Sequence, residues 1–132
     1  EVINELFDKQ QALLAIFVDS GKLIVKSFTA LELAELQGGD FPKGLSAVDC
    51  GVLYYASLEN DALILSNDKL LRQTAKHRTV PIHGTLWILD YFQAQSLCPN
   101  KRLCEALQLL NAGNFRRLPA KEVNARLKTW SV

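Results

Sequence analysis

Apolar residues along the chain form either short continuous runs or stripes at helical spacing. The run Ala62 to Leu65 is wholly apolar, which predicts a strand covered on both faces in a parallel sheet. Residues 66–68, Ser-Asn-Asp, then turn the chain, and apolar positions recur at helical spacing through Leu70, Leu71, Thr74 and Ala75. Ligands of open α/β folds bind at the carboxyl edge of the sheet. The turn at 66–68 is therefore a candidate site.

The same alternation continues on both sides of this stretch. Further helices are expected over about 1–7, 8–21, 29–36, 45–58, 86–92, 101–111 and 119–127, and further short strands over 23–25 and 79–82. Strands that alternate with helices at this spacing predict an α/β sandwich with a mostly parallel sheet. With 132 residues and no internal repeat or long linker, the chain is expected to form one domain over 1–132.

Composition excludes several classes of protein. The chain is 48% hydrophobic and 22% charged, as in ordinary globular proteins. Its net charge of +1 provides no strong field toward nucleic acid or membranes, so any RNA contact must come from a local patch. The longest apolar run, Ala12 to Val18, is far shorter than the roughly 20 residues of a membrane span. Three cysteines without CxxC spacing predict reduced thiols in a cytoplasmic protein and no zinc site.

Asp49 is the most unusual residue of the predicted helices. It lies four residues after Leu45 and four before Leu53, so it shares their apolar stripe. A carboxylate there is costly unless it is paired, hydrogen-bonded or bound to a metal ion. Ser46 to Asp49 also fits a capping box. Both roles stay open, and they are compatible.

The remaining candidate chemistry is acidic. The chain has no nucleophile-elbow, phosphate-loop or dinucleotide motif, and His77 and His83 lack ligand-like spacing, so His83 is expected to be a packed or rim residue. Glu5, Asp49 and Asp68 are each near the start of a helix or the end of a strand. Glu5 could instead be solvated, and Asn67 or Asp68 could simply cap a helix. Clustered carboxylates suit Mg²⁺ or Mn²⁺, which can activate water against a phosphodiester.

Three segments carry a resemblance to a known family: LSAVDCGVLYYASLENDALILSNDKLLRQTA, VPIHGTLWILDYF and EVINEL. The first two resemble the PIN domain, in particular the VapC-like toxin ribonucleases, and EVINEL is similar to a further acidic helix of that family. The resemblance implies a PIN-like three-layer α/β/α sandwich and a metal-dependent endoribonuclease that forms the toxin of a toxin–antitoxin pair. Its implied partners are an RNA substrate, an antitoxin protein and a second copy in a homodimer. A catalytically inactive PIN-like module that binds protein or RNA is the alternative.

The resemblance also implies residue roles. Glu5, Asp49 and Asp68 take three of the four acidic positions that bind Mg²⁺ or Mn²⁺, and their carboxylates are expected to converge within about 10 Å. Ser66 takes the position of a residue that orients the site. Lys69 and Arg72 could contact RNA phosphates, or they could form a solvated face with an Asp68–Arg72 pair.

The sequence departs from the family pattern at its start. The family's N-terminal strand, which carries the first acidic residue, has no counterpart before Glu1, and the sequence contains no methionine. The sequence therefore predicts a PIN-like domain that lacks its N-terminal strand.

Overall fold

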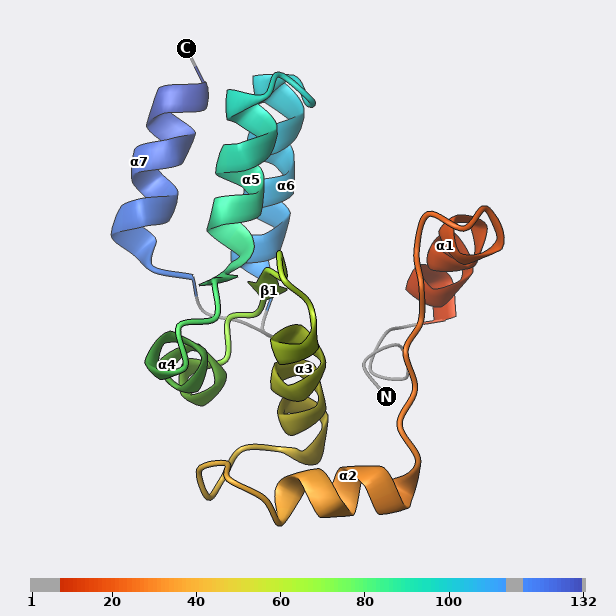
Figure 1. Ribbon diagram of the computed structural model, residues 1–132. Coiled ribbons are helices and arrows are strands. Elements are labelled where there is room, and N and C mark those ends of the chain that lie inside the picture. Colours follow the sequence, from red (N-terminus) through yellow and green to blue (C-terminus); the bar gives the residue numbers. More distant parts are fainter. Residues whose placement is uncertain (1–7, 114–117, 132) are drawn as a thin grey trace. The chain divides into compact units, whose positions relative to one another are not determined.

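The computed structural model describes residues 8–113 and 118–131 of the chain. Its elements, in chain order (Figure 1), are α1 (Asp8–Asp19), α2 (Ala30–Gln37), α3 (Ala47–Leu58), β1 (Ile64–Leu65), α4 (Lys69–His77), β2 (Ile82–His83), α5 (Thr85–Ala94), α6 (Asn100–Ala112) and α7 (Ala120–Trp130). The helices predicted from residue 8 onward are confirmed, whereas the one expected over 1–7 lies outside the described residues. No helix in the described ranges is long and apolar enough to cross a membrane.

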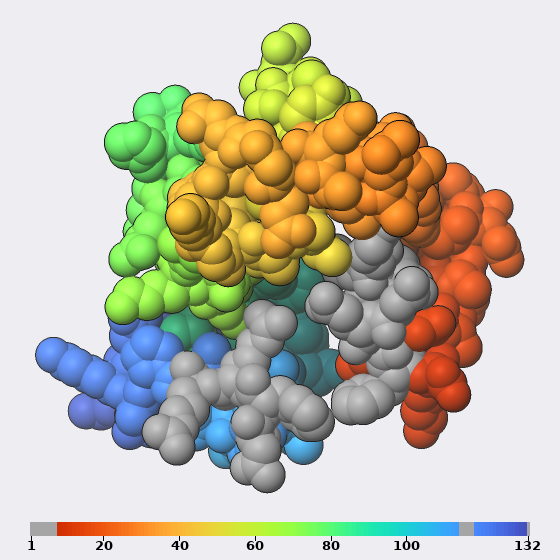
Figure 2. Space-filling model, turned by 90° about the horizontal axis from the view of Figure 1, so that it is seen from below, coloured from red at the N-terminus to blue at the C-terminus, as the bar shows by residue number. Residues whose placement is uncertain are grey.

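The chain divides into two compact units. One comprises Glu1–Ile64 and Asp68–Pro81, and the other comprises Leu65–Asn67 and Ile82–Val132. In the first unit α2 contacts α3, and Figure 2 shows the side chains of α2 (orange) adjoining those of the following loop (yellow). A Cβ atom at Gly51 in α3 would lie 3.2 Å from the ring of Phe28. Glycine at this position therefore lets the aromatic ring pack against the helix.

The sheet of the described residues consists of β1 and β2 in parallel. The N–H of Ile64 donates to the carbonyl of Pro81, and the N–H of Ser66 donates to that of His83, both at 2.9 Å. The α/β class is confirmed. The three-layer sandwich stays a prediction, because β1 and β2 are the only strands in residues 8–113 and 118–131.

Both strands of this sheet differ from the sequence-based prediction. Ile64 is buried, but Leu63 is 41% exposed and Leu65 is 53% exposed, so the expectation of a strand covered on both faces is wrong. Successive strand residues point to opposite faces, and here only one face carries core residues. The strand expected over 79–82 begins later, because Thr79 has a φ of 58° and lies in a turn.

The strand expected over 23–25 does not form. These residues are irregular, and Ile24 is 83% exposed. A three-residue apolar run has too little periodicity to specify a strand, which also requires a neighbouring backbone to pair with.

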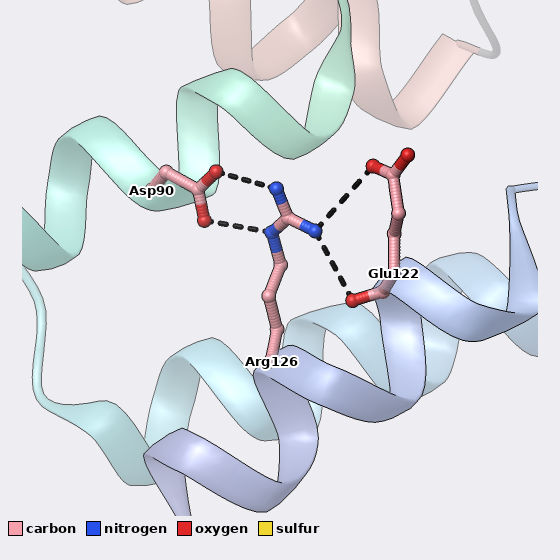
Figure 3. A network of polar contacts seen from close by, with 3 residues as sticks. All are labelled: Asp90, Glu122 and Arg126. Carbon is pink, nitrogen blue, oxygen red and sulfur yellow. Dashed lines mark hydrogen bonds and ion pairs between the residues drawn. The ribbon is translucent and has the colours of Figure 1, made fainter.

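The second unit contains a three-helix core. The helix α6 contacts both α5 and α7, and the buried side chains are Leu89, Leu103, Leu107, Val123 and Trp130. Arg126 of α7 donates to both carboxylate oxygens of Asp90 in α5 at 2.7 Å, and it also contacts Glu122 (Figure 3). The hydrogen bond with Asp90 raises the pKa of Arg126 further above its ordinary value. This bidentate contact fixes α7 on α5.

Candidate functional site

Asp68 ends the turn after β1 and begins α4. Its side-chain Oδ1 accepts a hydrogen bond from the N–H of Leu71 at 2.8 Å, so Asp68 is the N-cap residue of this helix. The capping role considered from the sequence is therefore confirmed for Asp68. A carboxylate offers about four lone-pair positions, so capping is compatible with binding a cation.

Asn67, the other residue considered as a cap of α4, has a different role. Its side-chain nitrogen donates to the hydroxyl of Thr85 at 2.7 Å, and its side-chain oxygen accepts from the Thr85 N–H at 3.0 Å. Gly84, the N-cap residue of α5, has no side chain that could accept from that helix. Asn67 thus caps α5 from the turn that carries Ser66, and the two elements are held together inside the second unit.

Replacing Asn67 tests the contribution of its hydrogen bonds with Thr85. Asn67→Ala is expected to lower the free energy of unfolding by about 1–3 kcal/mol, because the first N–H of α5 loses its acceptor in a half-buried position. Asn67→Asp keeps the acceptor for Thr85 and should lose less. Urea denaturation followed by circular dichroism measures both variants. Equal stability of Asn67→Ala and the natural chain would contradict a stabilising role of the contact between Asn67 and Thr85.

Asp49 lies in the first turn of α3 and is half-buried. The hydroxyl of Ser46 accepts a hydrogen bond from the Asp49 N–H at 3.1 Å, which confirms the Ser46 half of the predicted capping box. Leu53, one turn after Asp49 on α3, and Leu45, which precedes the N-cap residue Ser46, are both 2% exposed. Asp49 thus lies among buried residues of the first unit, where removing a charge from water is costly.

Cys50 follows Asp49 and is buried. Burial raises the pKa of its thiol, and the negative charge of Asp49 raises it further against a smaller opposing effect of Arg78. A thiol whose pKa is raised stays protonated and is a poor nucleophile. Cys50 is therefore a packing residue.

The predicted metal site is described only in part. Asp49 and Asp68 belong to the same compact unit, whereas Glu5 lies outside the described residues. Within residues 8–113 and 118–131, no group of three or more His, Cys, Asp or Glu side chains is placed to hold a metal ion. The convergence of three carboxylates stays a prediction. Two aspartates provide oxygen donors, which are the ligands that Mg²⁺ and Mn²⁺ prefer.

The helix α4 has buried residues on one side and two basic residues away from that side. Leu71, Thr74 and Ala75 are buried on one side. Lys69 and Arg72 lie one turn apart on the other side, where Lys69 is exposed and Arg72 is half-buried. The two cations thus lie one and four residues after Asp68, away from the buried side of this helix.

Sequence reasoning missed an aromatic cluster after β2. His83 is stacked on Trp87 with ring centroids 4.4 Å apart, and Trp87 is stacked on Tyr91 at 5.4 Å. This contact confirms that His83 is a packed residue. The spacing of four between successive rings is a sequence signal that could have revealed the cluster.

Comparison with known proteins identifies the family of the chain. A family model described as a PIN domain matches residues 1–131. No curated protein and no solved structure matches the chain. PIN domains are generally nucleases and typically use divalent metal ions. Because the match extends over nearly all of the sequence, the chain belongs to the PIN-domain family.

Proposed function

We propose that this chain is a metal-dependent endoribonuclease and the toxin of a VapC-like toxin–antitoxin pair. The observation that carries the proposal is that the half-buried Asp49 lies in the same unit as Asp68, which follows the end of β1. The chain also belongs to the PIN-domain family. Residues 1–132 act as a single domain in this proposal. An antitoxin protein and a second copy of the chain are the proposed partners.

Each candidate residue has a distinct role in the proposed site. Glu5, Asp49 and Asp68 would hold Mg²⁺ or Mn²⁺ through carboxylate oxygens, and Ser66 would orient the turn before Asp68. Held there, such a cation would supply an activated water and offset negative charge on the phosphodiester. Lys69 and Arg72 would bind RNA phosphates from the outer face of α4, where they can approach a polyanion from solvent.

Removal of the metal ion tests this proposal directly. The chain with added Mn²⁺ or Mg²⁺ is expected to cut a labelled single-stranded RNA internally, and excess EDTA should stop the reaction, because the carboxylates alone cannot offset the negative charge of the phosphodiester. Gel electrophoresis of the products measures cleavage, and cleavage should return when Mn²⁺ is restored. Cleavage that continues unchanged in EDTA would contradict the metal-dependent mechanism.

The second candidate function is a catalytically inactive PIN-like module, for which the capping of α4 is a sufficient role of Asp68. In that case Asp49 and Asp68 serve the helix starts alone, and the chain binds a protein partner or RNA without cutting it. Calorimetric titration with Mn²⁺ separates the candidates. Binding of Mn²⁺ to the enzyme should give a heat change with a defined stoichiometry, whereas titration of the inactive module should give only the heat of dilution.

A further inference from the structure

Three aromatic rings form a continuous stack on one face of the second unit. His83, Trp87 and Tyr91, here called the aromatic ladder, follow one another at intervals of four residues from the end of β2 along α5. The planes of His83 and Trp87 differ by 8°, and those of Trp87 and Tyr91 differ by 24°. The rings therefore stand nearly parallel, like successive bases of a nucleic acid strand.

The ladder is anchored at one end and open at the other. At its start, the carbonyl of His83 accepts a hydrogen bond from the N–H of Ser66, and Asn67 binds Thr85 through its side chain. At its far end, Tyr91 is 46% exposed. One helical turn beyond Tyr91 is Gln95, which provides no further ring. The last ring of the ladder is thus held in place by the ring beneath it while much of its own surface faces solvent.

The acidic residue beside Tyr91 is paired with a basic side chain. The neighbouring residue is Asp90, whose carboxylate would repel phosphate if it were unpaired. Both of its oxygens instead accept hydrogen bonds from Arg126 at 2.7 Å (Figure 3). Arg126 therefore pairs with the acidic group adjacent to Tyr91 in sequence, and the same guanidinium also contacts Glu122.

We infer that the aromatic ladder is a stacking platform for an unpaired base of single-stranded RNA, which adds its ring to the exposed end at Tyr91. The inference rests on the proposed ribonuclease function and extends it to how the substrate strand is held. A flat base gains dispersion and π contacts on a fixed aromatic ring, and every base has such a face. The platform would thus bind bases irrespective of their sequence.

Binding in EDTA tests the inference without cleavage. The full chain is titrated into a short fluorescein-labelled oligoadenylate at constant salt, and fluorescence anisotropy gives the Kd. Tyr91→Ala is expected to weaken binding about 5- to 150-fold, the range for losing one stacked base. Tyr91→Phe keeps the ring and should bind like the natural chain. Phe92→Ala, which removes a 40% exposed ring outside the ladder, should also leave the Kd unchanged.

An oligomer of the same charge with abasic residues completes the test. The difference between Tyr91→Ala and the natural chain should disappear on this probe, because it has no base to stack. Tyr91→Leu keeps apolar volume on α5 but has no aromatic face, so it should bind as weakly as Tyr91→Ala while circular dichroism shows an unchanged melting temperature.

Two results would overturn the platform: an unchanged Kd for Tyr91→Ala on oligoadenylate, or an equal loss on the abasic probe. Metal-dependent cleavage by the natural chain is measured separately. Intact cleavage with no effect of Tyr91 overturns only the platform, and a stacking effect without any cleavage overturns only the nuclease.

Discussion

Asp49→Asn is expected to abolish metal-dependent RNA cleavage and to leave the chain folded. Asparagine keeps the size of the side chain, and Ser46 caps α3 through the backbone N–H of residue 49, which the substitution does not touch. Replacing a residue that only supports a metal ligand typically costs about 10- to 100-fold in activity. Loss of a metal-binding carboxylate itself should reduce the rate of RNA cleavage by more than that. The melting temperature should stay nearly unchanged or rise, since a half-buried negative charge is removed.

Matched variants show whether this loss is specific to the site. Asp61→Asn makes the same chemical change at an exposed position after α3 and should cleave at the natural rate. Asp68→Asn removes another proposed metal-binding carboxylate, so it should also lose cleavage. Because asparagine is a good N-cap residue for α4, this variant should stay folded. Initial rates at saturating Mn²⁺ and thermal melts measure all three. A large loss of stability with cleavage intact would show that Asp49 has only a structural role.

Leu107→Ala is expected to lower the free energy of unfolding by about 2–5 kcal/mol, the range for removing a large aliphatic side chain from a core. Leu107 is 0% exposed in α6, and Leu103 and Val123 belong to the same buried cluster. Truncation removes apolar contacts and leaves a cavity between helices whose backbones cannot fully close it. Since a domain is stable by only about 5–15 kcal/mol, the loss would take up a large part of the total.

The same helix offers a control for this loss. Leu109 lies two residues after Leu107 and is 76% exposed. Leu109→Ala should therefore change the free energy of unfolding by no more than about 0.5 kcal/mol, as surface substitutions usually do. Urea denaturation followed by circular dichroism gives both values. Equal effects at the two positions would contradict the packing of α6 in the second unit.

The helices could be predicted from the sequence because their signals are local. Thr29 and Glu32 form a capping box at α2, with hydrogen bonds of 3.1 and 2.7 Å over three residues. Ser46 and Asp68 likewise act on N–H groups three residues ahead. A cap next to an apolar stripe gives both the start and the buried face of a helix, so tertiary information adds little.

The sheet and part of the candidate site depend on contacts between distant residues. Ile64 pairs with the backbone of Pro81, and Asn67 meets Thr85 across 18 positions. Neither pairing has a short-range sequence signal, because the partner could be any strand or turn at a suitable position. The strand expected over 23–25 was wrong for the same reason. The roles of Asp49 and Asp68 follow from their positions, while Glu5, outside the described residues, stays a prediction.

Both tryptophans of the chain, Trp87 and Trp130, belong to the second unit. Trp130 is 5% exposed in the helix core, and Trp87 is stacked between His83 and Tyr91. Intrinsic tryptophan emission therefore reports on that unit alone, whereas far-ultraviolet circular dichroism reports on the helices of both. The two optical signals coincide during unfolding only if the units unfold as one cooperative system. The cooperativity of unfolding of the two units can therefore be measured on the natural chain without an added label.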